Sequence, residues 1–143
     1  MKNLIKTGTK ILEFENWILY LHPNQCYLGR TYLWAKRHDA VDFVDMNSEE
    51  WKEFRKITPH IKQIIQKLFS PDMFNYASLG NIAPHLHVHI IPRYKNIHYF
   101  EGLAFNDKRW GKNYSPYNRK FSIPLKVHNT IAQLIEENIH DIF

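Results

Sequence analysis

The sequence contains a single cysteine, only five glycines and no long apolar run. Its lone thiol, Cys26, cannot form an internal disulfide, and the residues around it include no second thiol that would complete a cysteine-based zinc site. No stretch approaches the roughly 20 apolar residues of a membrane-spanning helix, and the N-terminal residues lack the apolar core of a secretory signal. We therefore expect a cytoplasmic protein with no membrane association.

What the sequence does contain is enough apolar surface for a compact core. The chain has 143 residues, of which 44% are hydrophobic and 15% aromatic, and it has no repeat or low-complexity tract. We expect a single domain over residues 1–143, with its core in residues 10–95 and an irregular tail and C-terminal helix in residues 96–143. The formal net charge of +5 favours acidic or phosphate-bearing partners. Because no stacking motif is evident, nucleic acid is not an expected partner.

Short runs of β-branched, aromatic and alternating apolar residues predict the strands of a sheet. A two-residue turn at Glu15-Asn16 joins the first two strands, and the last two follow each other closely enough to be antiparallel neighbours. The predicted strands are Lys10–Phe14, Trp17–Leu21, Thr31–Ala35, Phe74–Leu79 and a histidine-containing strand within Pro84–Arg93.

Two helices are predicted from apolar residues that recur every three or four positions. The first begins at Asn47 or Ser48 and extends to Leu68, with a kink or a break at Pro59. The second covers Val127–Ile139, and the segment between the histidine strand and this helix is expected to be irregular. Together these elements predict an α+β fold, in which helices cover an antiparallel sheet.

The most informative segment is Pro84-His85-Leu86-His87-Val88-His89-Ile90-Ile91-Pro92-Arg93. Alternation along a strand puts His85, His87 and His89 on one face and the apolar residues on the other. These histidines could serve a structural role, bind a metal or attack phosphorus. The first and third Cα atoms of such a row lie about 13 Å apart, so all three cannot share one metal, and a zinc enzyme would need ligands from elsewhere. Nucleophilic catalysis fits better, because the central imidazole can attack while its neighbours orient it.

The segment His85–Ile91 resembles the histidine-triad motif of the HIT superfamily, which reads His-apolar-His-apolar-His-apolar-apolar. The later run Trp110–Tyr114 is similar to a tail of bacterial HIT proteins labelled diadenosine-polyphosphate hydrolase-like, and its aromatic rings could stack on a base, cover the site or simply pack. The resemblance spans about residues 10–95, and its other matching segments are Leu28–Leu33, Lys36–His38, Leu79–Asn81 and Pro92–Tyr94.

This resemblance implies a HIT-like sheet with a long helix and a C-terminal helix packed against it. It implies a nucleotide hydrolase, or a nucleotidyl transferase, acting at the α-phosphate of an adenine-containing substrate: a dinucleoside polyphosphate, a nucleoside phosphoramidate or a related adenylated compound. His87 would be the nucleophile and form a nucleotidyl-histidine, while a backbone carbonyl near His85 accepts a hydrogen bond from its opposite ring nitrogen. His85 and His89 would contact phosphate oxygens and assist proton transfer. The resemblance also implies a homodimer. We expect no cofactor and no metal.

Four further residues are candidates for substrate binding. By the same resemblance, Asn81 would contact the phosphate or the leaving group. Arg30 stands where a fourth histidine is usual, and His22 stands where an acidic or amide group would hold the ribose. Arg93 could add positive charge around a polyphosphate. The departures at Arg30 and His22 leave two alternatives open, namely a nucleotide-binding or signalling module with little catalysis and a metal-dependent phosphohydrolase.

Overall fold

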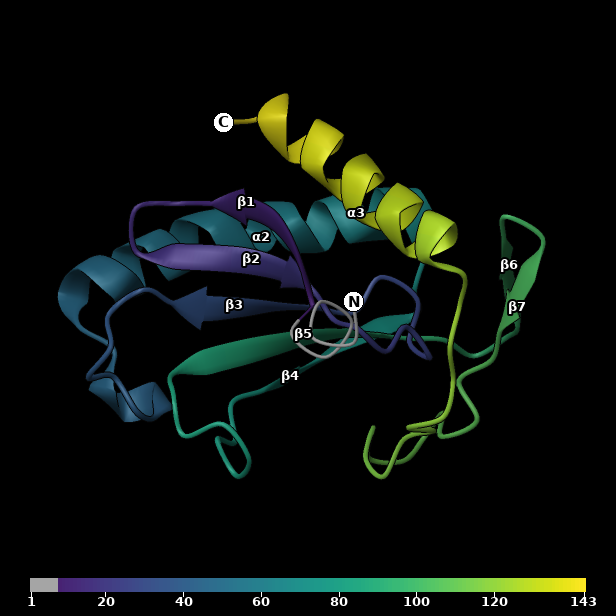
Figure 1. Ribbon diagram of the computed structural model, residues 1–143, viewed down its shortest axis with the longest axis horizontal. Helices are drawn as coiled ribbons and strands as arrows, with labels where there is room; N and C mark the ends of the chain where they lie inside the picture. Colours follow the sequence, from purple (N-terminus) through teal and green to yellow (C-terminus); the bar gives the residue numbers. More distant parts are fainter. Residues whose placement is uncertain (1–7) are drawn as a thin grey trace.

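The computed structural model describes residues 8–143, and its centre is a five-stranded antiparallel sheet (Figure 1). The strands run in the spatial order β1-β2-β3-β5-β4, so β1 and β4 form the two edges. All four pairings are antiparallel, as predicted for the last two strands. The strands are β1 (Thr9–Glu13), β2 (Trp17–Leu21), β3 (Thr31–Ala35), β4 (Met73–Ala77) and β5 (His87–Arg93).

The two faces of the sheet have different compositions. Side chains at alternate positions of β2 and β3 are buried and join one core cluster with the helices. The intervening positions lie on the other face of the sheet. There Tyr20 of β2 is paired with Tyr32 of β3, and Tyr32 is paired with His89 of β5. On the same face Trp34 is opposite His87. The period-two alternation therefore sends mostly apolar residues, including Trp17, toward the helices, and it places Tyr20, Tyr32, Trp34 and the histidines of β5 on the other face.

Two helices complete the core. Helix α2 (Ser48–Phe69) lies behind the sheet in Figure 1, and α3 (Leu125–His140) crosses above β1. Asn47 caps α2 by accepting a hydrogen bond from the amide of Glu50, whose carboxylate binds the Asn47 amide in return. The helix continues through Pro59, so a break into two pieces is wrong. Pro59 is exposed, and the buried isoleucines on the opposite side of the helix hold both halves against the sheet.

The predicted irregular region after β5 contains a hairpin that the sequence reading missed. Strands β6 (His98–Phe100) and β7 (Leu103–Phe105) pair across a two-residue turn. Both turn residues, Glu101 and Gly102, have positive φ values, of 51° and 75°. That conformation is typical of tight hairpin turns. A short 3-10 helix, η1 (Phe43–Asp45), precedes α2.

The predicted α+β fold class is confirmed. The sheet is antiparallel, and the long helix and the C-terminal helix share a core with its buried face. Across residues 8–143, the helices include none that is long and apolar enough to cross a membrane.

Candidate functional site

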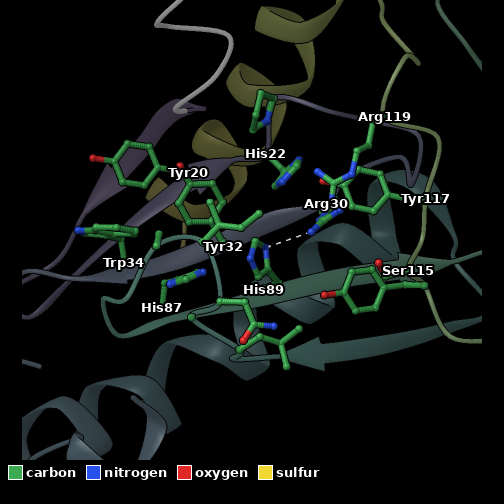
Figure 2. A pocket seen from close by; sticks show the side chains of 17 residues that line it. Tyr20, His22, Arg30, Tyr32, Trp34, His87, His89, Ser115, Tyr117 and Arg119 are labelled. Carbon is green, nitrogen blue, oxygen red and sulfur yellow. Dashed lines mark hydrogen bonds between the residues drawn. The ribbon is translucent and has the colours of Figure 1, made fainter. Parts of the chain in front are cut away.

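A cavity of about 770 Å³ opens on the histidine-bearing face of the sheet (Figure 2). Strands β2, β3 and β5 form its floor, the loop after β4 forms one wall, and a segment following β7 forms another. Five of the seven candidate residues line it, whereas His85 and Arg93 do not. The five are His22, Arg30, Asn81, His87 and His89. The site therefore gathers groups from positions spread over about half of the chain.

The His87 imidazole is held in one defined tautomer. Its Nδ1 lies 2.6 Å from the backbone oxygen of His85. A carbonyl oxygen can only accept a hydrogen bond, so Nδ1 donates it. In the neutral ring the proton is then on Nδ1, and Nε2 keeps a free lone pair. His87 lines the cavity from β5, so the geometry suits a nitrogen nucleophile.

Trp34 packs against two of the three histidines. Its ring is stacked on His85 with centroids 4.2 Å apart, and on His87 with centroids 5.4 Å apart. His85 precedes β5, and its Nε2 donates a hydrogen bond of 2.5 Å to the backbone oxygen of Ala35. The His85 ring is therefore held by its hydrogen bond to β3 and by its stacking on Trp34. Of the three histidines in the motif, His87 and His89 line the cavity. The expectation that the His85 side chain contacts phosphate oxygens is therefore not met, because its ring does not line the cavity.

His89 and His22 are neutral histidines next to a cation. Burial, followed by the charge of Arg30 and then by His87, lowers the pKa of His89 to about 3. Burial and the same arginine hold the pKa of His22 well below its ordinary value. Nη2 of Arg30 lies 3.4 Å from Nδ1 of His89, and because a guanidinium can only donate, His89 carries its proton on Nε2. His89 can thus offer an N–H group to a substrate oxygen.

Arg30 is buried without an anionic partner. The residue is 2% exposed, and its Nε and Nη1 have no hydrogen-bond partner within residues 8–143. Its guanidinium lies over the rings of Tyr117 and Tyr114, with centroid distances of 4.7 and 5.3 Å. The preceding Gly29 has a φ of 87°, and a Cβ there would approach the Phe69 ring to 3.0 Å. A glycine is therefore required to turn the chain so that Arg30 faces the cavity.

The second wall of the cavity belongs to residues 107–119, which we call the strap. The strap carries the tyrosines over Arg30, and Tyr27 fastens it by donating a hydrogen bond of 2.5 Å to the backbone oxygen of Tyr114. The strap residues that line the cavity are Tyr114, Ser115, Tyr117 and Arg119. Of the two aromatic residues singled out in the sequence, Tyr114 therefore lines the cavity, whereas Trp110 does not.

Arg93 does not lie at the cavity, contrary to its predicted contact with substrate. Its Nε and Nη2 donate to the carboxylate of Asp107 at 2.7 and 3.1 Å, in a pair that is almost completely buried. The remaining donors bind the side chain of Asn75 and the backbone oxygens of Lys112 and Arg109. Every N–H of the guanidinium is thus used inside the protein. The physical reason for the correction is that Arg93 anchors the strap and has no donor left for a phosphate.

Two aromatic residues of the floor, Tyr32 and Trp34, were not singled out by sequence reasoning. The signal that could have found them is the alternation of β3, which places both on the face opposite Leu33. Pairing of β3 with the histidine strand then brings them beside His87 and His89. Among residues 8–143, no group of three or more His, Cys, Asp or Glu side chains is placed to hold a metal ion.

The chain resembles known proteins both in sequence and in structure. A family model described as HIT domain matches residues 5–96. A HIT-like protein of Mycoplasma genitalium is 32% identical over 114 residues, covering 74% of this chain and 76% of that protein. A histidine triad protein from Sinorhizobium meliloti 1021 superposes with a TM-score of 0.78 at 21% identity, over 96% of this chain and 94% of that one. A hypothetical histidine triad nucleotide-binding protein from Sulfolobus tokodaii strain 7 superposes with a TM-score of 0.71 at 18% identity, over 98% and 91% of the two chains.

Proposed function

This chain belongs to the HIT family, and on that basis we propose that it is a nucleotide hydrolase acting at an α-phosphate through His87. The substrate class is an adenine-containing dinucleoside polyphosphate, a nucleoside phosphoramidate or a related adenylated compound. One observation carries the proposal, which is the hydrogen bond of 2.6 Å from Nδ1 of His87 to the backbone oxygen of His85. The name of the Sulfolobus tokodaii relative, a nucleotide-binding protein, is consistent with the same ligand class.

In the first step, Nε2 of His87 attacks the α-phosphorus, and the bond from phosphorus to the leaving group breaks. The imidazole becomes positively charged, and its Nδ1–H bond to the His85 carbonyl strengthens as this charge develops. The Nε2–H group of His89 and the side-chain amide of Asn81 are among the donors that line the cavity and could bind the phosphate oxygens. His85 acts through its backbone oxygen and through its packing on Trp34.

In the second step, water attacks the same phosphorus and the bond to Nε2 breaks, releasing a nucleoside monophosphate and regenerating the neutral ring. The proton of the water leaves with the product or passes to solvent. The lowered pKa of His89 keeps this neighbour uncharged at neutral pH, so it does not compete electrostatically with the imidazolium formed at His87.

A second candidate is a nucleotide-binding module with weak catalysis. The observation that favours it is the pair of departures at Arg30 and His22, because an arginine cannot act as a base and a buried neutral histidine lacks the carboxylate expected for ribose. This alternative keeps the same cavity and ligand and differs only in turnover.

We further propose that residues 1–143 act as one domain and that two copies associate. The β4 edge of the sheet and the loop after it expose apolar side chains, as an interface between subunits would require. The most exposed are Met73, Tyr76, Leu79 and Ile82, at 48%, 51%, 62% and 86%. Sedimentation equilibrium measures the mass directly, and a monomer at all concentrations would contradict association.

The function is tested by mass spectrometry of the protein mixed with diadenosine polyphosphate or adenosine phosphoramidate and quenched under alkaline conditions, with AMP release followed in parallel. We expect an AMP-sized adduct on His87 and release of AMP. His87→Asn abolishes both, and the matched control His140→Asn, an exposed position at the end of α3, changes neither. Binding without adduct or AMP supports the weak-catalysis module instead. Activity that disappears with a chelator and returns with a divalent metal would support the metal-dependent alternative.

A further inference from the structure

The proposed reaction at His87 leaves the buried cation Arg30 without a role. Among residues 8–143 two arginines are buried, and each is 2% exposed. Arg93 is paired with the carboxylate of Asp107, whereas Arg30 has no carboxylate partner in the described part of the chain, and its Nε and Nη1 have no hydrogen-bond partner there. A buried charged donor without a partner is costly, so this arrangement calls for an anionic ligand.

The two sides of the cavity differ in what they can bind. On the β2–β3 side, the rings of Tyr20 and Tyr32 are stacked with centroids 5.2 Å apart, and both line the cavity. On the other side of β5, the wall is the loop of residues 79–83, which follows the edge strand β4. Aromatic rings favour a flat, aromatic base, so the nucleoside half of a substrate would lie toward β2 and β3. The leaving group would then lie toward the loop after β4.

Arg30 belongs to the nucleoside side, beside the place where the sugar would lie. The His22 ring is 6.1 Å from the Tyr32 ring and 5.6 Å from the His89 ring, measured between centroids, so His22 connects the aromatic floor with the reacting pair. A sugar that joins a base on the floor to a phosphate at His87 would therefore pass His22. Arg30 lies 3.4 Å from His89, and Figure 2 shows it with His22 on the far side of His89 from His87.

The surroundings of Arg30 suit an anion better than a pair of sugar hydroxyls. Among the residues that the structure describes, no acidic side chain lines the cavity, while a second cation, Arg119, does. Tyr117 contacts both guanidinium groups, at centroid distances of 4.7 and 5.0 Å. Because Tyr117 and Tyr114 hold the Arg30 guanidinium by its flat face, its N–H groups are oriented before a ligand arrives, which lowers the entropic cost of binding.

We propose that Arg30, assisted by Arg119, binds a phosphate carried by the sugar of the nucleotide, on its 2′ or 3′ oxygen. This inference rests on the proposed function and adds to it a preference for nucleotides whose ribose is itself phosphorylated. The sugar phosphate is distinct from the phosphate that His87 attacks and from the leaving group. It positions the nucleoside half through charge-assisted hydrogen bonds and stays on the released product.

Calorimetric titration of the His87→Asn protein, which prevents turnover, tests the proposal with four ligands. These are AMP, ADP, adenosine 2′,5′-bisphosphate and adenosine 3′,5′-bisphosphate. We expect at least one bisphosphate to bind about tenfold or more tightly than AMP. ADP also has two phosphates, but both are at the 5′ position, so it should gain less than that bisphosphate. The two bisphosphates distinguish the 2′ from the 3′ oxygen.

Removal of the Arg30 charge should abolish this preference selectively. In the His87→Asn protein, Arg30→Gln should weaken the preferred bisphosphate about tenfold and leave AMP and ADP within about twofold. The matched control Arg55→Gln removes the same charge from an exposed position of α2 and should leave all four affinities unchanged.

The possible outcomes separate this inference from the proposed function. If neither bisphosphate binds more tightly than AMP, or if Arg30→Gln weakens all ligands equally, the inference is wrong while nucleotide binding stands. If Arg30→Gln selectively weakens ADP, Arg30 contacts the 5′ phosphate chain and the inference is wrong as well. If no nucleotide binds to the folded His87→Asn protein, the proposed function is refuted and the inference with it.

A stability measurement provides a readout that does not depend on activity. Removing an unpaired buried charge should leave the melting temperature of the Arg30→Gln protein equal to or above that of the parent, and the preferred bisphosphate should raise the melting temperature of the parent more than that of the variant. Equal increases would contradict the proposal. If the glutamine variant does not fold, Arg30→Lys keeps the charge but loses the planar fork, and it should weaken the bisphosphate more than AMP. Equal weakening would overturn the proposal in that variant too.

Discussion

Arg93 on β5 and Asp107 at the start of the strap form a bidentate ion pair with distances of 2.7 and 3.1 Å, although 14 positions separate them in the sequence. The carboxylate also accepts hydrogen bonds from the backbone amides of Tyr94 and Arg109. This pair is the junction between the sheet that carries the histidines and the segment that covers them, so its loss should affect both stability and substrate binding.

Replacing Arg93 with Met should destabilise the protein by about 3–5 kcal/mol, because the buried carboxylate of Asp107 is left without its counterion. The strap should loosen, and the Michaelis constant for a nucleotide substrate should rise more than the turnover number falls. Urea denaturation and steady-state kinetics measure the two effects.

The surface pair of Lys10 and Glu13 provides the control for that experiment. The exposed Glu13 carboxylate pairs with Lys10 at 2.7 Å and with Lys36 at 2.9 Å, and Glu13→Gln, which weakens both pairs, should leave the free energy of unfolding nearly unchanged. If Glu13→Gln and Arg93→Met lowered the free energy of unfolding equally, the contribution of the Arg93–Asp107 pair to stability would not depend on its burial.

The buried histidines make stability depend on pH. A histidine in the unfolded chain binds a proton near pH 6.5, whereas folded His89 binds one only near pH 3. Between these values the unfolded state holds more protons, so the free energy of unfolding falls as the pH falls, by about 1.4 kcal/mol per pH unit for this residue. His22 and His128, whose pKa values are also lowered, act in the same direction.

The His89→Gln variant should therefore show a shallower pH dependence by about one proton, when unfolding in urea is measured at several pH values between 4 and 6.5. Identical slopes for the variant and the parent would refute this assignment. Arg30→Gln should have a related effect, because removing the neighbouring charge raises the pKa of His89, which NMR titration of the imidazole protons can follow.

Trp34 should matter more for turnover than for folding. Its ring fixes His85 and His87 by stacking, at centroid distances of 4.2 and 5.4 Å, and it is only half-buried. Trp34→Leu should lower the turnover number about three- to tenfold, as expected from the loss of one aromatic contact. The control Trp51→Leu removes an indole that is 46% exposed on α2 and should leave turnover unchanged. A fall in turnover that is as large for Trp51→Leu would argue against positioning by Trp34.

Pro59→Ala should stabilise the protein. The proline lies in the interior of α2, is exposed, and cannot donate the amide hydrogen that an ordinary residue would give to the carbonyl of Arg55. Alanine restores this bond and should raise the free energy of unfolding by about 1–3 kcal/mol, measured by urea denaturation. A loss of stability would indicate that α2 depends on a bend at this position.

Local sequence patterns predicted most of the regular structure. The alternation in β2 and β3, the two-residue turn between β1 and β2 and the cap at Asn47 are short-range features, and each appears where the sequence placed it. The β6–β7 hairpin was missed because its strands have only three residues each, which is too short for a period to be recognised. The predicted break at Pro59 does not occur. The loss of one helical hydrogen bond at this proline is outweighed by the contacts between α2 and the rest of the core.

Only those features of the site that depend on neighbouring residues in the sequence could be predicted. The motif placed His87 and His89 correctly beside each other, since strand geometry determines that spacing. The partner of Arg93 could not be inferred, because a basic residue has the same sequence signature whether it faces a ligand or a buried carboxylate. The same ambiguity applies in reverse to Arg30, whose lack of a partner is visible only when its surroundings are known.

The strap lies outside residues 5–96, the part of the chain that matches the family model. His87 and the strap residues that line the same cavity consequently come from separate stretches of the sequence, which are joined in space by the Arg93–Asp107 pair and by the hydrogen bond from Tyr27 to Tyr114. Insertions, deletions or substitutions within the strap can alter what is accepted without altering the nucleophile. Under the proposed function, substrate preference would then vary with the strap while His87 and its hydrogen bond stay the same, and exchanging the strap between relatives would test this directly.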